Sequence, residues 1–191
     1  MASIAYYYFD FKDTRKQDCR GLVSSLITQL STRRSHHIYD ILSNFYEAHE
    51  NGSRLPSEVD LIRCLKNLLE ISGQGEVYVI IDAVDECAGE RPYNPGIPSP
   101  RENVLRLIKE LVNLRHPDIR VCITSRPEVD IRTVLDPLAS HAMSLHDQAG
   151  QKGDIIDYVK SFVESEANMR RWRQGDRQLV IDTLSQTANG M

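Results

Sequence analysis

A run of apolar residues that ends in a cluster of acids constrains this chain more than any other segment. Residues 77–81 read Val-Tyr-Val-Ile-Ile, and the acidic segment Asp82–Glu86 follows directly. A short apolar run rich in β-branched residues is typical of a strand buried on both faces, as in a parallel sheet. Ligands of such sheets collect at the carboxyl ends of the strands, where Asp82 would lie. The segment therefore predicts an α/β fold with a site at that edge.

The acids after this strand are suited to holding a metal ion beside a phosphate. The carboxylate of Asp82 can hold Mg²⁺ directly or through its water shell. Ala83 is small, so bulky groups can approach the backbone there. Asp85 or Glu86 would lie on the turn beyond, where one of them could orient or deprotonate a water for attack on a phosphoryl group. We expect Asp82 to be the metal ligand and Glu86 and Asp85 to be the catalytic candidates.

A second apolar strand pattern, at 119–123, also ends in polar residues. At the carboxyl edge of a neighbouring strand, Thr124 or Ser125 could hydrogen-bond a phosphate or the attacking water. Arg126 carries a permanent positive charge and could reach a γ-phosphate. These three residues are the predicted phosphate-binding group.

Strand and helix patterns alternate along the chain in the order typical of a three-layer, doubly wound parallel sheet. Asp18 is a helix-capping candidate, and Ser57 with Asp60 forms an acidic variant of the capping box. The Gly and Pro residues between 88 and 100 predict a loop beside the acidic strand, either a lid or a passive insertion. The expected strands are 4–11, 77–81, 119–123 and 142–145, and the expected helices lie near 18–30, 38–45, 57–69, 104–112, 129–134, 155–162 and 179–184.

Composition excludes several classes of protein. The formal net charge of −4 provides no basic stripe for a nucleic-acid backbone, so we expect no nucleic-acid partner. No stretch approaches the ~20 apolar residues that span a membrane. The four cysteines have no CxxC spacing, which favours reduced thiols over a disulfide framework or a zinc site. We expect a cytoplasmic protein with no membrane partner.

The motifs resemble those of NACHT-type P-loop NTPases. Asp82-Ala83-Val84-Asp85-Glu86 is similar to the Walker B element of that family, in which a small residue follows the magnesium aspartate and an acidic pair lies further on. The segment 123–127, Ile-Thr-Ser-Arg-Pro, resembles the sensor 1 strand. The segments 6–13 and 20–30 resemble the second strand and helix of large NACHT proteins, particularly the fungal ones. The resemblance covers roughly Ile4 to Met191.

The resemblance implies a P-loop NTPase-like core at 1–148 and the start of a helical region at 149–191. It implies Mg²⁺ and ATP as cofactors of the complete domain, with Asp82 on the metal, Glu86 or Asp85 positioning water, and Arg126 sensing the γ-phosphate. Complete proteins of this family are ATP-dependent switches for signal transduction and self-assembly, often in innate immunity or cell death. The partners would be the remaining parts of a multidomain NACHT protein or homologous NACHT chains.

The chain departs from the family in one respect: it contains no Gly-Lys-Ser or Gly-Lys-Thr. The P-loop supplies most of the grip on the β- and γ-phosphates and in the family follows the first, central strand. We therefore expect a piece of a longer protein, through natural truncation, a gene-model error or a deliberate cut. We expect weak or no nucleotide hydrolysis by this chain alone.

The family's sheet order would place the absent strand between the strands at 119–123 and 142–145, leaving a gap of about 10 Å. Those strands would close together, the last would detach, or another chain would fill the slot. We expect an isolated chain of this kind to be less stable than a complete domain. Two other functions stay open: a non-catalytic interaction fragment, and a stand-alone magnesium phosphohydrolase that uses the three carboxylates without a P-loop.

Overall fold

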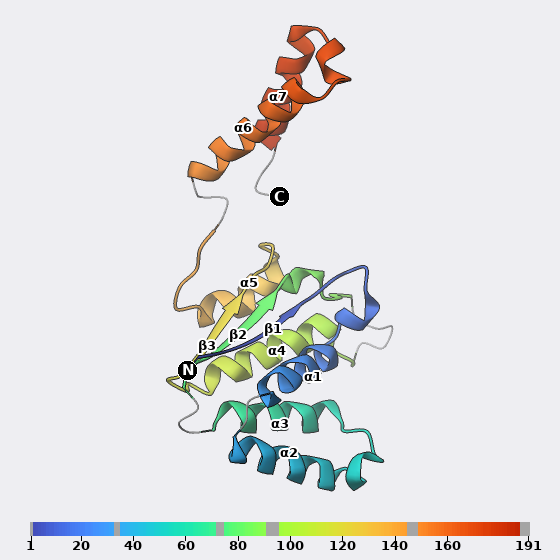
Figure 1. Ribbon diagram of the computed structural model, residues 1–191, viewed down its shortest axis with the longest axis vertical. Helices are drawn as coiled ribbons and strands as arrows, with labels where there is room; N and C mark the ends of the chain where they lie inside the picture. Colours follow the sequence, from blue (N-terminus) through green and yellow to red (C-terminus); the bar gives the residue numbers. More distant parts are fainter. Residues whose placement is uncertain (1, 33–34, 72–74, 91–95, 145–148, 188–191) are drawn as a thin grey trace. The chain divides into compact units, whose positions relative to one another are not determined.

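The first part of the chain is built around a parallel sheet (Figure 1). The structure is a computed structural model that describes residues 2–32, 35–71, 75–90, 96–144 and 149–187. It contains two compact units, residues 1–139 and 140–191. In the first unit β1 (Ser3–Tyr8), β2 (Val77–Asp82) and β3 (Ile119–Ile123) pair in parallel in the order β1-β2-β3. This confirms the predicted α/β class and its parallel sheet.

Helices follow each strand, and local capping signals fix where several of them begin. Asp18 accepts the Gly21 N–H at 2.7 Å at the start of α1, and Ser57 and Asp60 form a capping box at the start of α3, both as predicted. A second capping box, Ser99 with Glu102, starts a helix at the end of the predicted loop. The helices of the first unit are α1 (Cys19–Ser31), α2 (His36–Ala48), α3 (Glu58–Leu69), α4 (Pro100–Asn113) and α5 (Val129–Leu135).

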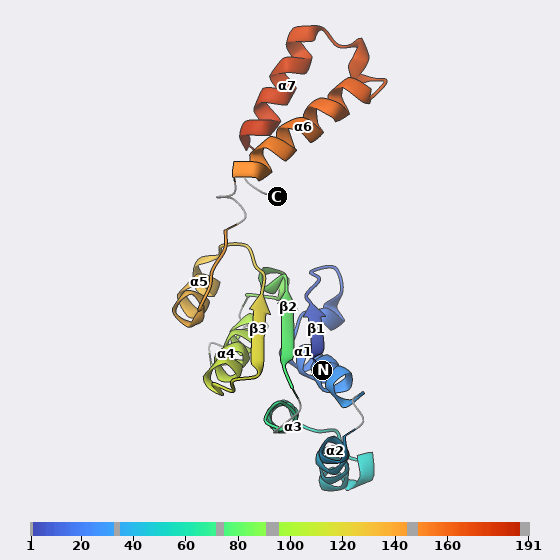
Figure 2. The same ribbon diagram turned by 60° about the vertical axis from the view of Figure 1, so that its left-hand side comes forward.

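The helices pack on one face of the sheet. Each crossover, from β1 to β2 and from β2 to β3, moves one step in the same direction, so right-handed connections place their helices on the same side. Figures 1 and 2 show α1 and α4 along that face, with α3 and α2 beyond α1. The core forms there. Fully buried members are Ala5, Leu22, Leu26, Leu65, Leu69, Val77, Val79, Ile81, Val104 and Ile108.

The opposite face of the sheet is exposed in the part of the chain that the structure describes. Ile4, Tyr6 and Tyr8 alternate with the buried residues of β1 and are 62%, 58% and 47% exposed. The prediction of helices on both faces is therefore not met by the described residues. The physical reason is the strand order, because a helix on the second face needs a crossover in the opposite direction.

The two edges of the sheet differ. On β1 the outward-facing backbone of Tyr6 is bound by the Gln29 side chain, which accepts the Tyr6 N–H at 3.0 Å and donates to its carbonyl at 2.7 Å. On β3 the backbone of residues 118 and 124 bonds to β2, so by alternation the N–H and C=O groups of Val121 and Ile123 point outward. Among the described residues no strand pairs with that edge.

The predicted strand at 142–145 is not formed where the structure describes it. Residues 142–144 have no regular structure and are exposed, and Leu145 lies outside the described residues. A strand needs a neighbour to satisfy its backbone, and the described residues provide no strand next to this segment. The predicted boundary between 148 and 149 borders residues outside the description, and it stays a prediction.

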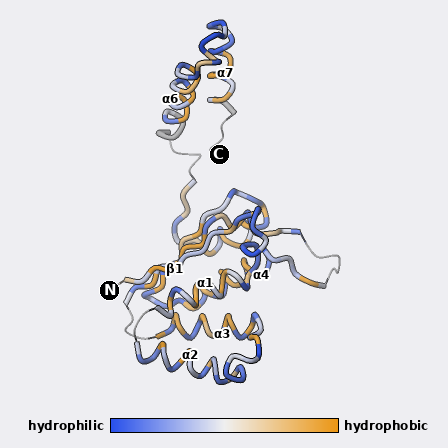
Figure 3. Tube along the Cα trace, turned by 45° about the vertical axis from the view of Figure 1, so that its right-hand side comes forward, coloured by the Kyte–Doolittle hydropathy of each residue, from blue (hydrophilic) through white to orange (hydrophobic). Residues whose placement is uncertain are grey.

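The second unit is a helical hairpin of α6 (Ala149–Ser165) and α7 (Gln174–Thr187), as the apolar spacing predicts. Val163 and Ile181 are its buried residues among those described. Figure 3 shows hydrophilic and hydrophobic positions interleaved along both helices, as in helices that bury one side. Across the described residues, no helix is both long enough and apolar enough to cross a membrane.

Adjacent tyrosines of β1 test the one-sided packing. Tyr7 is 8% exposed and contacts Phe9 edge to face at 5.1 Å between ring centroids, whereas Tyr6 is 58% exposed. We expect Tyr7→Ala to lower the free energy of unfolding by about 3–5 kcal/mol and Tyr6→Ala by less than about 1 kcal/mol in urea titrations. Equal costs for the two substitutions would show that the second face is covered.

Candidate functional site

The carboxyl ends of β2 and β3 bring two predicted site residues together. The Thr124 hydroxyl donates to Asp82 Oδ1 and accepts the Ala83 N–H at 3.0 Å. The Thr124 backbone makes two further hydrogen bonds. Its N–H donates to the Ile81 carbonyl at 3.0 Å, and its carbonyl accepts the Val84 N–H at 3.1 Å. Thr124 is thereby fixed beside Asp82, and both side chains remain exposed at the edge where parallel sheets bind ligands.

Ala83 turns the chain sharply after the strand. Its φ of 55° and ψ of 49° are left-handed, a conformation that costs an L-residue roughly 1–2 kcal/mol. A 3₁₀ turn at Val84–Glu86 follows, and the fully buried Val84 side chain anchors it in the core. The small side chain predicted to allow close approach is thus also the one that tolerates this backbone. The carboxylates of the next two acids, Asp85 and Glu86, accept the N–H groups of Arg126 and Phe11.

Asp85 is paired with Arg126. Its carboxylate is 8% exposed, accepts the Arg126 N–H at 2.9 Å, and lies 3.5 Å from Arg126 Nε. The guanidinium is 72% exposed and faces solvent at the carboxyl edge of β3. The structure therefore brings these two predicted residues together, with Asp85 as the anchor of Arg126.

Glu86 and Ser125 take other hydrogen-bond partners. Glu86 accepts the Phe11 N–H at 3.2 Å beyond the end of β1, and the Ser125 hydroxyl donates to the Arg126 carbonyl at 2.6 Å. The described residues include no group of three or more His, Cys, Asp or Glu placed to hold a metal together. Asp82 remains as one exposed carboxylate beside a hydroxyl. That donor set fits Mg²⁺, which keeps several waters and takes one or two carboxylates plus phosphate oxygens.

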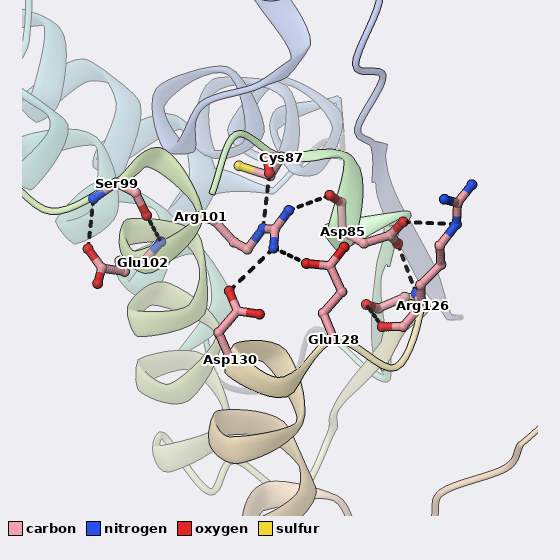
Figure 4. Close-up of polar contacts among 9 residues, drawn as sticks. Asp85, Cys87, Ser99, Arg101, Glu102, Arg126, Glu128 and Asp130 are labelled. Carbon is pink, nitrogen blue, oxygen red and sulfur yellow. Dashed lines mark hydrogen bonds and ion pairs between the residues drawn. The ribbon is translucent and has the colours of Figure 1, made fainter. Parts of the chain in front are cut away.

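Arg101, on the first turn of α4, is the main residue of this region that sequence reasoning missed (Figure 4). Its Nη2 donates to the Asp85 carbonyl at 2.6 Å, and its Nε donates to the Cys87 carbonyl at 3.0 Å. Its Nη1 donates to the Glu128 carboxylate and, at 3.3 Å, to that of Asp130. The sequence did contain a signal for Arg101. The helix dipole disfavours a cation in the first turn of a helix, so a cation at that position indicates that it has partners.

Electrostatics at this position favour the charged arginine. Burial alone would lower the pKa of Arg101, but the hydrogen bond and charge of Glu128, followed by those of Asp130, raise the pKa above its usual value. Next to it, burial raises the pKa of the Cys87 thiol to about 12, so this thiol stays protonated at neutral pH. Its S–H lies 3.1 Å from the Gln17 carbonyl. Cys87 is therefore a buried, protonated thiol.

Substitutions at Ala83 test the left-handed turn. We expect Ala83→Gly to raise the free energy of unfolding by up to about 1 kcal/mol, because glycine adopts this backbone without steric cost. We expect Ala83→Val to lower it by roughly 1–2 kcal/mol, since a β-branched side chain crowds the same backbone. Urea unfolding of both variants measures the difference. A glycine variant less stable than the valine variant would contradict the left-handed assignment.

Comparison with known protein families identifies a relationship. A family model described as Nephrocystin 3, N-terminal, matches residues 1–126 of the 191. No curated protein and no solved structure matches the chain. The matched segment contains Asp82, Asp85, Glu86, Arg101 and the 124–126 segment. The chain belongs to the nephrocystin 3 N-terminal family.

Proposed function

We propose that this chain is the magnesium- and γ-phosphate-facing part of a NACHT-type nucleoside triphosphatase, which in a complete protein acts as an ATP-dependent switch for signalling and self-assembly. The hydrogen bond from Thr124 to Asp82 carries the proposal. It joins the acid that follows one parallel strand to the hydroxyl that follows the next, at the edge where such sheets bind ligands. An isolated acidic turn would need no such partner.

The side chains take distinct roles in this proposal. Asp82 holds Mg²⁺, which when bound neutralises charge on the phosphates. Thr124 orients Asp82 and offers its hydroxyl to a phosphate oxygen. Arg126, exposed and anchored by Asp85, meets the γ-phosphate. Glu86 orients the attacking water after releasing its hydrogen bond to the Phe11 N–H.

The chain by itself supplies only part of the grip on a nucleotide. It contains no Gly-Lys-Ser or Gly-Lys-Thr, so the amides and lysine that hold the β- and γ-phosphates have to come from another segment or chain. Within the described residues, the β3 edge without a paired strand and the exposed face with Ile4 and Tyr6 leave room for another strand and helix. The chain alone therefore binds ATP weakly and does not turn it over. Its four free cysteines suit the reducing cytoplasm.

An NMR titration with MgATP tests this proposal. We expect the amides of 82–86 and 124–126 to shift with a dissociation constant on the order of 1 mM, and EDTA to reverse the shifts. Asp82→Asn should weaken binding about tenfold or more by removing the metal ligand. Asp118→Asn, at the opposite end of the sheet, is the matched control and should change nothing. Micromolar affinity, or binding indifferent to Asp82→Asn and EDTA, would contradict a partial magnesium site.

The exposed face of the sheet favours a second candidate, a non-catalytic interaction module. Contiguous exposed apolar residues mark interaction sites, and Ile4, Tyr6 and Tyr8 lie on consecutive outward positions of β1. This function predicts concentration-dependent association in analytical ultracentrifugation that Tyr6→Lys abolishes. Tyr39→Lys, on an exposed position of α2, serves as the control and should associate like the parent chain. A monomer at all concentrations would remove self-association from this candidate.

A further inference from the structure

Arg101 is a largely buried cation that none of the roles above uses. Its side chain is 11% exposed, and it lies in the first turn of α4, where the helix dipole opposes a positive charge. Burying a charge is costly unless hydrogen bonds and opposite charges compensate for it. Four acceptors do so: the carbonyls of Asp85 and Cys87 and the carboxylates of Glu128 and Asp130.

These acceptors belong to two different segments. The carbonyls lie on the turn after β2, and the carboxylates lie at the start of α5, the helix that follows β3. The planar guanidinium, with donors in a fixed fork, can serve both segments at once, whereas a lysine ammonium is a single point of charge. Gly89 leaves room for it, because a Cβ there would lie 3.0 Å from Arg101 Cζ.

A second link joins the same two segments. The Asp85 carboxylate accepts the Arg126 N–H and faces the Arg126 guanidinium, while the Asp85 carbonyl is held by Arg101 (Figure 4). Fixing that carbonyl fixes the backbone from which the carboxylate projects. Charge works in the same direction. Arg101 offsets Glu128 and Asp130, so in its absence these two carboxylates would lose the cation that pairs with them.

We propose that Arg101 is the positioning residue for Arg126. By clamping the turn after β2 to the segment between β3 and α5, it holds Asp85 in place and keeps the Arg126 guanidinium free to meet an anionic polyphosphate. The ligand class rests on the proposed function, whereas the positioning is a property of the free chain. An experiment can therefore contradict the proposed function without contradicting the positioning role, and the reverse.

Hydrogen exchange followed by NMR tests the positioning in the free chain. In Arg101→Gln the Arg126 amide should exchange about tenfold faster or more, because the Asp85 acceptor is no longer fixed. Arg106→Gln, an exposed arginine on the same helix, is the matched control. Leu107→Ala, a buried position of α4, reports what general destabilisation does to every amide. If Arg101 served only overall stability, Arg101→Gln would raise the exchange rate of the Arg126 amide by the same factor as the rates of the other protected amides. That result overturns the proposal.

Titration with inorganic pyrophosphate in Mg²⁺ tests the consequence for the ligand. We expect Arg101→Gln, and also Arg101→Lys, to weaken binding about fivefold or more, although Arg101 itself does not reach the ligand. Unchanged affinity in both variants overturns the link to the phosphate. Should the parent chain not bind pyrophosphate while Arg126 exchange still responds, the proposed function fails and the positioning stands.

A second variant guards against misfolding. If Arg101→Gln does not fold, Glu128→Gln with Asp130→Asn removes the negative charges of the two acceptors at the start of α5 and leaves the cation in place. Faster exchange confined to the Arg126 amide supports the clamp. Exchange unchanged at Arg126 overturns it.

Discussion

Pairing of β2 with a parallel neighbour on each side is the constraint on which the first unit depends. Val77, Val79 and Ile81 alternate onto the buried face, and this alternation fixes the register with both neighbours. The same register brings Thr124, which follows the Ile81 partner Ile123, beside Asp82. A slip of the β2 register by one residue would turn the valines to solvent, and it would also separate Thr124 from Asp82. Core packing and site geometry are therefore one requirement.

The strand order that allows this pairing also leaves the sheet incomplete on one side. Parallel sheets are ordinarily covered on both faces, but crossovers in a single direction cover one. The two edges of the sheet also differ: at β1 the Gln29 amide satisfies the outward backbone of Tyr6. The described residues provide no equivalent at β3, beside Thr124 and Arg126. The open edge and the candidate site thus lie on the same strand, which suits a site completed by another segment.

What the sequence predicts well is what depends on local signals. The apolar run before Asp82, the caps at Asp18 and Ser57, and the alternation of strands and helices act within a few residues. The directions of Asp85 and Glu86 could not be predicted, because they follow from the left-handed backbone of Ala83. That backbone is held by a residue 41 positions away, since the Thr124 hydroxyl accepts the Ala83 N–H.

Hydrogen-bond partners that are distant in the chain could not be predicted from the sequence for the same reason. Arg101 bonds to residues 14 to 29 positions distant, and Gln29 to one 23 positions distant, with no spacing that marks either. The pattern at 142–145 is a real local signal for a strand. It failed over 142–144 because strand formation depends on a paired neighbour as well as on the residues themselves.

The geometry distinguishes Asp85 from Glu86, which the sequence alone leaves as equivalent candidates for activating water. Freeing the Asp85 carboxylate would break a charge-assisted pair with Arg126, worth roughly 1.5–3 kcal/mol, and leave a nearly buried charge behind. Freeing Glu86 breaks one hydrogen bond to the Phe11 N–H and, among the described residues, no ion pair, so its cost is smaller. In the proposed function Glu86 can therefore change partners, whereas Asp85 cannot do so without releasing Arg126. On that proposal the three acids after β2 divide into a metal ligand, an anchor for the arginine and a mobile base.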